Sequence, residues 1–505
     1  MCAFALRDIK AAPPVNDDSR AASRLAEISA DARPTPAYSP IVLAGLVRSL
    51  EFLLITAVGF AVHRLHVAPG YGYGVEYFVV IPGMALLSVL AWQAFDLYTP
   101  AAFRAPIGHG SKLAAGWTLV FLAALAAIFF LKLDNALSRV WLLGWYAGGL
   151  GVLAAERFAV SAIVRTLTQQ GKLDRRTVIV GGGPMAEPVL RDLAAAQQDS
   201  DLRILGIFDD RRDDRSPDVV AGYPKLGTID DLVEFARHTR LDLVIFTLPI
   251  SAEARLLQML RKLWVLPIDI RLAAHTNKLR FRPRSYSYIG NVPVLDVFDK
   301  PIADWDVLAK SAFDKVVGAL CLILFAPVMA AVALAIKLDS RGPVLFRQTR
   351  YGFNNEKIEV YKFRSMYADK LDPAAAKLVT KGDPRVTRVG RFIRKTSLDE
   401  LPQLFNVVFK GNLSLVGPRP HAMHARAAEH LYDEVVDGYF ARHRVKPGLT
   451  GWAQINGWRG ETDTPEKIQK RVECDLNYIE NWSILLDIYI LALTPIALLK
   501  TENAY

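Results

Sequence analysis

Long apolar runs separated by charged segments dominate the first third of this 505-residue chain. Four such runs lie at about 41 to 62, 77 to 97, 114 to 131 and 139 to 160. Each is close to the roughly 20 residues that a membrane-spanning helix needs. The pattern therefore predicts a four-helix transmembrane domain over residues 40–162. Residues 1–39 are rich in Ala, Pro, Asp, Arg and Ser, which predicts a disordered cytoplasmic tail.

Charged residues qualify the first helix and set the orientation of the bundle. Arg48 and Glu51 lie inside the first run, and such side chains are costly in lipid unless they face the bundle or reach its edge. Basic residues gather before the first run and after the fourth, at Arg20, Arg24, Arg33, Arg165, Lys172, Arg175 and Arg176. Both ends of the bundle are therefore expected in the cytoplasm, although Lys132 and Arg139 in the third connection weaken the contrast.

The period of the pattern changes at Arg175, where strand-like runs begin to alternate with helical ones. Thr177–Val180 is a short buried-strand run, and the glycine turn Gly181–Gly183 leads into a helical pattern. Residues 175–290 are therefore predicted to form a Rossmann-like, doubly wound α/β domain. A lone G-x-G-x-x-A pattern is a weak sign of dinucleotide binding, so nucleotide binding and a structural or docking role both stay open. An oxidoreductase is the rival function that this domain alone supports.

A fifth apolar run, Val316 to Ile336, is long enough to span a membrane. Pro327 lies near its middle, where a missing amide kinks a helix, so a helix-break-helix that enters one leaflet and returns is the alternative. Four basic residues that flank the run are expected to contact lipid headgroups. They are Lys310, Lys315, Lys337 and Arg341. The apolar stretch 482–499 is expected to lie at the membrane interface.

Composition and charge narrow the class of protein. A hydrophobic content of 52% and a mean hydropathy of +0.19 are high for a soluble protein and favour a membrane enzyme with soluble domains. The net charge of +10 comes from basic residues spread beside apolar segments, which favours anionic lipid and phosphate substrates over nucleic acid. Cys2, Cys321 and Cys474 suggest no disulfide framework and are expected to be reduced thiols.

An adjacent carboxylate pair, Asp399-Glu400, lies among basic residues in the C-terminal part of the chain. Guanidinium groups hold and neutralise phosphate oxygens, and a carboxylate among them can stay ionised and attack phosphorus. The same segment also fits a capping box, in which Ser397 caps a helix and Glu400 reaches back to the backbone amide of the cap. The two interpretations are compatible, because a helix N-terminus also favours a bound phosphate.

Four motifs in this part of the chain carry a family resemblance. They are Phe363-Arg364-Ser365-Met366, Arg391–Gln403, Gly417-Pro418-Arg419-Pro420 and Lys446–Gly460. With them, residues 308–505 resemble the catalytic domain of polyprenyl-phosphate hexose-1-phosphate transferases, the large monotopic phosphoglycosyl transferases. The resemblance implies an α/β catalytic domain with a re-entrant membrane helix at about 313–337 that is broken at Pro327.

The resemblance also implies roles for individual residues. Asp399 is the expected nucleophile, and Glu400 is expected to help place Mg²⁺, together with Asp399, or to assist proton handling. The residues expected to contact substrate are Lys362, Arg364, Arg394, Arg419, Arg459 and Asp475. For Asp475 the alternative is an exposed helix carboxylate paired with Arg471.

The reaction that the resemblance implies is transfer of hexose-1-phosphate from a UDP-hexose to undecaprenyl phosphate, through an aspartyl phosphosugar intermediate and with release of UMP. Glucose is the first expectation for the hexose and galactose the second. The expected setting is the bacterial inner membrane, with both soluble domains in the cytoplasm, at the start of exopolysaccharide or capsule synthesis. A multi-span transferase without a covalent intermediate and a non-catalytic scaffold are the alternatives. The oligomeric state, a homo-oligomer included, stays open.

Overall fold

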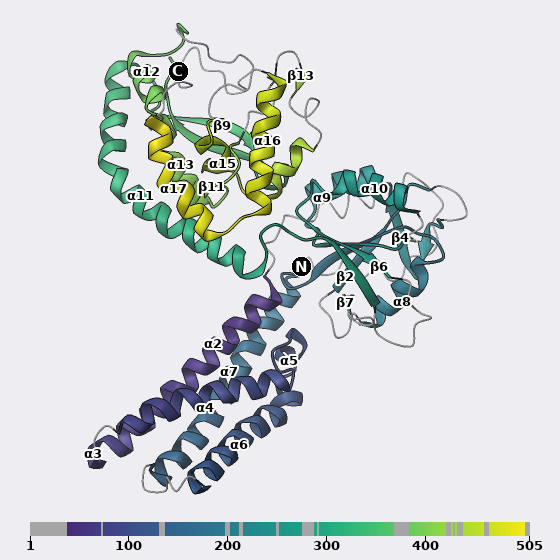
Figure 1. Cartoon of the computed structure of the whole chain (residues 1–505), viewed down its shortest axis with the longest axis vertical. Coiled ribbons are helices and arrows are strands. Elements are labelled where there is room, and N and C mark those ends of the chain that lie inside the picture. Colours follow the sequence, from purple (N-terminus) through teal and green to yellow (C-terminus); the bar gives the residue numbers. More distant parts are fainter. Residues whose placement is uncertain are drawn as a thin grey trace. The chain divides into compact units, whose positions relative to one another are not determined.

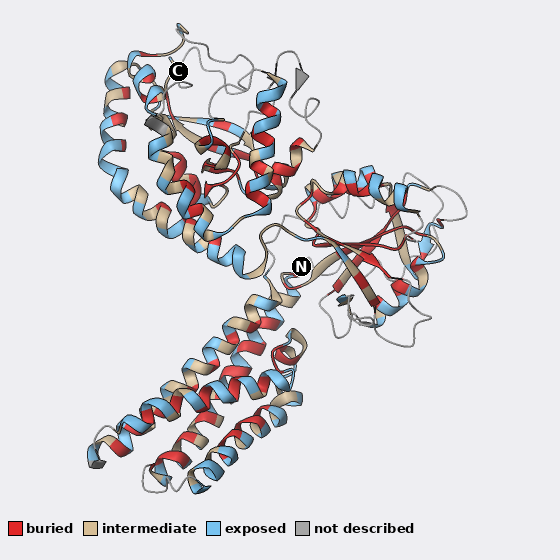
Figure 2. Cartoon of the chain, in the orientation of Figure 1, coloured by how far each residue is buried: buried red, intermediate tan, exposed pale blue. Residues whose placement is uncertain are grey.

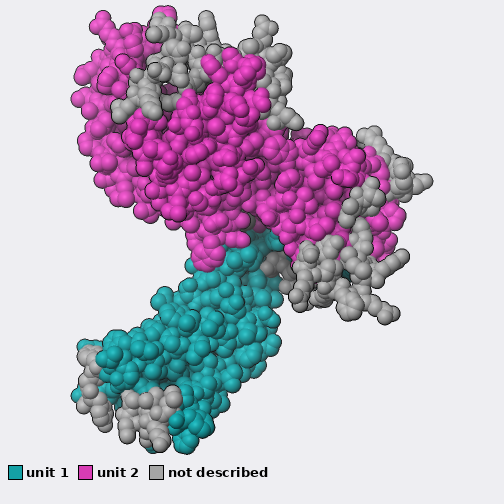
Figure 3. Space-filling model, in the orientation of Figure 1, with its two compact units in different colours: residues 1–13, 35–175, 192–203 teal, residues 14–34, 176–191, 204–505 magenta. Residues whose placement is uncertain are grey.

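A computed structural model describes residues 38–71, 74–130, 137–196, 202–211, 216–248, 252–274, 287–289, 292–367, 383–420, 426–427, 430–431, 438–458 and 464–499. The chain forms two compact units, which are coloured separately in Figure 3. The first is built mainly from residues within 35–175, and the second mainly from residues 176–191 and 204–505.

Four long helices make up most of the first unit. They are α2 (Pro40–Val62), α4 (Val75–Ala94), α6 (Pro106–Phe130) and α7 (Arg139–Gln169). Short segments continue or join them, namely η2 (His63–Val67), α3 (Ala68–Tyr71) and α5 (Pro100–Arg104). Figure 2 shows buried residues on the facing sides of these helices and exposed residues on their outer sides. Four tryptophans are among the buried residues, Trp92, Trp117, Trp141 and Trp145, and many of the exposed residues are large and apolar. An apolar exterior of this kind suits a lipid environment.

The charged residues of the first helix face the bundle, one of the two arrangements that would make them tolerable. Glu51 is fully buried on α2, and its carboxylate lies 2.7 Å from the guanidinium of Arg157 on α7. The hydroxyl of Tyr98 donates to the same carboxylate at 2.5 Å. The guanidinium of Arg48 lies 4.9 Å from the centre of the Tyr98 ring. Pairing of this kind offsets part of the cost of charge inside an apolar bundle.

Five helices among the described residues are long and apolar enough to cross a membrane. Four of them are the long helices of the first unit, the first counted from Pro40 to Val67. The fifth is α11 (Asp304–Asp339) in the second unit. The chain is therefore a membrane protein with both helical and α/β parts, as the sequence predicts.

An eight-stranded mixed sheet forms the middle part of the chain. Its order is β3 (Val219–Val220), β4 (Tyr223–Gly227), β2 (Leu202–Phe208), β1 (Arg175–Val180), β5 (Leu243–Phe246), β6 (Asp269–Ala273), β8 (Val292–Phe298) and β7 (Ser287–Ile289). β1 pairs in parallel with β5, and β5 with β6, whereas β6 and β8 are antiparallel. Buried Val, Ile and Phe side chains line the central strands, which is typical of a sheet covered on both faces.

Three helices accompany this sheet. Figure 1 shows α9 (Ile229–His238) and α10 (Glu253–Leu263) on one side of the sheet and α8 (Ala186–Ala196) on the other. The glycine turn between β1 and α8 is held by a hydrogen bond within this domain. The amide of Gly182 donates to the carboxylate of Asp209 at 2.8 Å. Arg211 pairs with that carboxylate at 2.8 Å.

A smaller α/β arrangement follows α11. Its hairpin consists of β9 (Leu345–Tyr351) and β10 (Lys357–Phe363), with η4 (Phe353–Asn355) at the turn. β11 (Ser414–Val416) pairs in parallel with β14 (Gly448–Thr450), and the two-residue strands β12 (Arg426–Ala427) and β13 (His430–Leu431) pair with each other. The remaining helical segments are α12 (Arg388–Lys395), η6 (Leu398–Glu400), α13 (Gln403–Phe405), η7 (Asn406–Lys410), η8 (Tyr439–Arg444), α15 (Trp452–Ile455), α16 (Pro465–Glu480) and α17 (Ile484–Leu499).

α11 begins before the predicted re-entrant run and continues through Pro327 as one helix of 36 residues. Figure 1 shows it as a bent ribbon along one side of this arrangement. The sequence predicts a break at Pro327, whereas the structure shows bending without interruption. A proline removes one amide donor and clashes with a preceding carbonyl, which bends a helix when the neighbouring turns keep their hydrogen bonds.

Candidate active site

The carboxylate pair lies on a single turn of 3₁₀ helix. α12 ends at Lys395, and Ser397 then adopts a left-handed conformation with φ of 56° before η6 begins at Leu398. Such a φ is uncommon outside glycine and turns the chain sharply. The side chain of Ser397 does not cap η6, so the capping-box interpretation is wrong. Ser397 instead makes the turn between α12 and η6 with its left-handed backbone.

Glu400 is held by two cations, one from strand β10 and one from the connection that follows β11. Lys362 on β10 lies 2.8 Å from Glu400 Oε1, and Arg419, three residues after β11, donates to the same oxygen at 2.5 Å. Burial opposes ionisation of this carboxyl, yet Arg419 and Lys362 hold its pKa well below the usual range. The side chain is 18% exposed, so solvent still reaches it. The structure thus brings together three of the residues predicted from the sequence.

Asp399 has a different electrostatic environment. Burial raises the pKa of its carboxyl to about 6, and the neighbouring charge of Glu400 acts in the same direction. The charges of Lys362, Arg394 and Arg419 oppose that shift. Two adjacent carboxyls whose pKa values are pushed apart are typical of sites where the groups have separate chemical roles. Asp399 is ionised for most of the time at neutral pH and lies among cations suited to phosphate oxygens.

Arg364 directly follows β10, and its buried side chain contacts the C-terminal end of α11. Its guanidinium donates to the carbonyls of Arg341 and Ser340 at 2.6 and 2.8 Å, and the residue is only 1% exposed. Cations at a helix C-terminus satisfy carbonyls that have no partner within the helix. The structure therefore gives Arg364 a structural contact, which is the alternative to its predicted and untested role in substrate binding.

Asp475 pairs with Arg442, a residue that the sequence does not single out. Nη2 of Arg442 lies 2.6 Å from Asp475 Oδ2 and also donates to the carbonyl of Arg419 at 2.8 Å. The predicted alternative of an exposed carboxylate is wrong, because Asp475 is only 2% exposed. Within Arg442-His443-Arg444, the sequence offers no pattern that separates a buried arginine from a solvated basic run.

The basic residues that flank the fifth apolar run divide into two kinds. Lys310 is only 9% exposed and bonds to Asp314 and Asp487, so the expectation that it contacts lipid headgroups is wrong. Its signal in the sequence is the spacing of four residues to Asp314, which pairs opposite charges on a helix. Lys337 bonds to the carbonyl of Gly342 and is exposed.

The glycine-rich segment that follows β14 is described as far as Trp458. Arg459, predicted to contact the diphosphate, lies outside the described residues. Asn456 donates from its side chain to the carbonyl of Trp452 at 2.8 Å and so helps to shape this loop.

The carboxylates were also predicted to place Mg²⁺. The described residues contain no group of three or more His, Cys, Asp and Glu side chains that would hold a metal by themselves. Mg²⁺ is commonly held by one or two carboxylates together with substrate phosphates. Asp399 and the second oxygen of Glu400 fit that pattern, because Lys362 and Arg419 both bond to Oε1.

Comparison with known proteins gives two family matches. Residues 305–501 match the bacterial sugar transferase family, and residues 93–274 match a CoA-binding domain family. The chain is 33% identical over 464 residues to UDP-glucose:undecaprenyl-phosphate glucose-1-phosphate transferase of Xanthomonas campestris pv. campestris, covering 91% of this chain and 94% of that protein.

Two further relatives cover less of the chain at higher identity. The protein of the same name from Escherichia coli (strain K12) is 39% identical over 395 residues, 78% of this chain and 82% of that protein. Undecaprenyl-phosphate glucose phosphotransferase of Komagataeibacter xylinus is 42% identical over 370 residues, 72% of this chain and 66% of that protein.

Proposed function

Because this chain belongs to the bacterial sugar transferase family, we propose that it transfers glucose-1-phosphate from UDP-glucose to undecaprenyl phosphate and releases UMP. The observation that carries the proposal is the convergence of Lys362 and Arg419 on Glu400, directly beside Asp399. The names of the relatives support the substrate pair. Galactose-1-phosphate transfer is the second candidate from the sequence.

The proposed chemistry uses the different charge states of the two carboxyls. An oxygen of ionised Asp399 attacks the sugar-side phosphorus of the UDP-sugar, and the bond from that phosphorus to the bridging oxygen breaks. UMP leaves with the bridging oxygen, and the hexose-phosphate stays bonded to Asp399. A phosphate oxygen of the lipid then attacks the same phosphorus and restores the carboxylate, so the sugar's anomeric bond stays intact throughout.

The surrounding cations supply most of what this reaction needs. Phosphoryl transfer depends on positioning and on neutralising the phosphate oxygens more than on covalent help from the protein. Arg419 and Lys362 are held at fixed positions by Glu400, and the charge of Arg394 also acts on Asp399. Mg²⁺ held by Asp399 and Glu400 would neutralise charge on the diphosphate. Glu400 thus acts by organising cations, in keeping with its low pKa.

The membrane topology is a further part of the proposal. The four helices of the first unit cross the inner membrane, and α11 enters one leaflet and returns, bending at Pro327. A polyprenyl phosphate has its chain in lipid and its phosphate at the interface, so the active site belongs at that boundary. This arrangement keeps the Rossmann-like domain and the catalytic residues in the cytoplasm, where UDP-sugars are made. The product would start assembly of an exopolysaccharide or capsule.

The most informative experiment measures UMP release by the purified full-length protein. UDP-glucose, UDP-galactose and UDP-N-acetylglucosamine are each supplied with undecaprenyl phosphate and Mg²⁺. We expect lipid-dependent UMP release with UDP-glucose and formation of undecaprenyl-diphosphate-glucose. Preference for UDP-galactose would support the second candidate, and lack of UMP release with every sugar would contradict the proposed function.

A further inference from the structure

Arg419 reaches Glu400 from a short connection whose backbone is fixed at several points. The amide of Gly417 donates to the carbonyl of Thr450 at 2.9 Å, and the amide of Gly448 donates to the carbonyl of Pro418 at 3.0 Å. A side chain substituted at Gly417 would meet the carbonyl oxygen of Lys446 at 2.5 Å, so these backbones approach too closely for any residue but glycine. The position of the Arg419 guanidinium therefore depends on how this connection is anchored.

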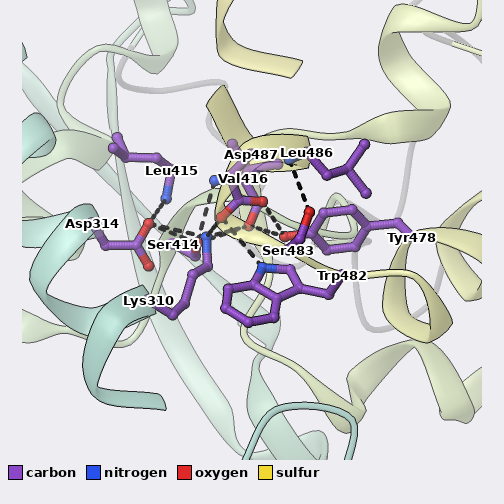
Figure 4. A network of polar contacts seen from close by, with 10 residues as sticks. All are labelled: Lys310, Asp314, Ser414, Leu415, Val416, Tyr478, Trp482, Ser483, Leu486 and Asp487. Atoms are coloured by element: carbon purple, nitrogen blue, oxygen red, sulfur yellow. Dashed lines mark hydrogen bonds and ion pairs between the residues drawn. The ribbon is translucent and has the colours of Figure 1, made fainter. Parts of the chain in front are cut away.

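A buried lysine anchors the beginning of the connection, as Figure 4 shows. Nζ of Lys310 donates to the carbonyl of Val416 at 3.1 Å, three residues before Arg419. It also pairs with Asp487 at 2.6 Å and Asp314 at 3.1 Å. Lys310 comes from α11 and Asp487 from α17, the two apolar helices of this part of the chain. One ammonium group thus joins both helices to β11.

The other groups of this network support the same strand. The hydroxyl of Tyr478 donates to Asp487 Oδ1 at 2.8 Å and lies 3.1 Å from the carbonyl of Val416. The carboxylate of Asp314 accepts from the backbone amide of Leu415 at 3.1 Å and from the hydroxyl of Ser414 at 3.0 Å. All three residues of β11 are therefore held by side chains from α11 or α16, so β11 cannot shift independently of those helices.

We infer that Lys310 and Asp487 are positioning residues. They fix the position of Arg419, the arginine that pairs with Glu400. The inference rests on the proposed function for its effect on turnover. The buried ammonium of Lys310 bonds to Asp314, Asp487 and the Val416 carbonyl, so these three partners fix its position. Removing Lys310 or Asp487 alone leaves a buried charge without its partner. Because the ion pair joins the apolar helices α11 and α17, the position of Arg419 also depends on how these two helices are placed.

The test compares Lys310→Met, Lys310→Arg and the control Lys470→Met in the full-length protein. Lys470 is exposed on α16 and forms a surface ion pair with Glu473. We expect Lys310→Met to lower kcat for UMP release by about tenfold or more, with the KM for UDP-glucose within about twofold of wild type. Lys310→Arg restores part of the loss, and Lys470→Met keeps wild-type kinetics. Equal kcat in Lys310→Met and Lys470→Met overturns the inference.

A double-mutant cycle distinguishes positioning from a general loss of structure. If Lys310 acts through Arg419, then adding Lys310→Met to Arg419→Ala lowers the residual rate by less than about twofold. Two independent losses that multiply would overturn the inference. The double variant Lys310→Met/Asp487→Leu removes both members of the central ion pair. It therefore leaves no uncompensated charge at Asp487, which favours a folded protein. Wild-type kcat in this double variant would also overturn it.

Hydrogen exchange gives a readout that does not depend on the sugar. The amides of Gly417 and Gly448 report on the connection, because each donates across it. We expect their exchange to accelerate by about tenfold or more in Lys310→Met, with the sheet strands β1 and β5 unchanged. Unchanged exchange at both glycines overturns the positioning inference. A wild-type protein that releases no UMP would contradict the proposed function alone, and this exchange measurement still decides the inference.

Discussion

Arg442 and Asp475 form an ion pair of 2.6 Å whose side chains are 0% and 2% exposed. The same guanidinium nitrogen donates to the carbonyl of Arg419. The pair therefore helps to fix the backbone of Arg419, whose side chain bonds to Glu400. Truncating one member of a buried pair is costly, since the other charge stays buried and uncompensated.

We predict that Asp475→Asn destabilises the protein by about 3 kcal/mol and lowers turnover. Glu473→Gln is the matched control, because Glu473 lies on the same helix and pairs with Lys470 at the surface. That control is expected to change stability by less than about 1 kcal/mol. Thermal unfolding and UMP release measured on both variants check the prediction, and equal effects in the two would contradict it.

Replacing Asp399, the proposed nucleophile, should abolish activity while making the protein more stable. Asp399→Asn keeps the shape of the side chain but removes the attacking charge, so we expect the barrier to rise by about 4 kcal/mol or more. Burial raises the pKa of Asp399 to about 6, so its stabilising contribution is full below the unfolded pKa of 3.8 and is lost as pH rises through 6. At pH 7 the variant should therefore gain on the order of 1 kcal/mol of stability.

Two measurements test this prediction. Wild-type enzyme given UDP-glucose without lipid should release about one equivalent of UMP and carry a hexose-phosphate adduct on the peptide that contains Asp399. Peptide mass spectrometry detects the adduct, and Asp399→Asn should not form it. A variant that keeps a tenth of wild-type turnover, or a wild-type enzyme without adduct, would contradict the covalent mechanism.

The pH dependence of kcat/KM should show an acid limb near the pKa of Asp399. Below about pH 6 its carboxyl is protonated and unable to attack, so kcat/KM should fall toward about tenfold per pH unit. The groups acting on Asp399 are Glu400, Lys362, Arg394 and Arg419. Glu400→Gln removes the only negative charge among them, so the limb should move to lower pH. UMP release between pH 5 and 8 measures the acid limb of the wild-type enzyme and of Glu400→Gln. An acid limb at the same pH in both proteins would contradict this electrostatic account.

The sequence predicts the parts of this protein that depend on local pattern. Apolar length indicates the helices, and strand-like runs alternating with helical ones indicate the sheet. The family resemblance places Lys362, Glu400 and Arg419 in one site, where the structure brings them together. It fails where a side chain's direction decides the outcome. Lys362 lies on β10 and Arg364 directly after its end, so the two would share one face if the strand continued. Arg364 nevertheless bonds to carbonyls at the end of α11, whereas Lys362 reaches Glu400.

Buried charge is the second source of error. Lys310 is 106 residues from the Val416 carbonyl and 177 residues from Asp487. Arg442 is 33 residues from Asp475. No local pattern specifies such pairings, because they depend on tertiary packing and on the cost of leaving a charge uncompensated. The expectation of lipid contacts at Lys310 fails for this reason.

Arg364 and Lys362 should respond differently to substitution. Arg364→Met removes donors to two carbonyls at the end of α11, so we expect a loss of about 2 kcal/mol in stability. The folded fraction should keep a kcat/KM for UDP-glucose within about threefold of wild type. Lys362→Met should instead lower kcat/KM by about a hundredfold with a smaller effect on stability. UMP release normalised to the amount of folded protein checks this difference. A loss of kcat/KM in Arg364→Met as large as that in Lys362→Met would contradict it.

The topology of α11 can be tested by cysteine labelling in a background in which Cys2, Cys321 and Cys474 are replaced by serine. Glu234→Cys on α9 and Lys357→Cys on β10 place thiols at exposed positions before and after α11. If α11 returns to its own side of the membrane, an impermeant maleimide added to intact cells should label neither site, and both should react after permeabilisation.

Pro327→Leu restores an amide donor inside α11 and removes the steric cause of the bend. It should therefore favour a straight helix that crosses, and labelling of Lys357→Cys should rise while Glu234→Cys stays protected. Labelling of Lys357→Cys alone in the protein that retains Pro327 would establish a fifth crossing, and it would move Asp399 to the side of the membrane that lacks UDP-sugars.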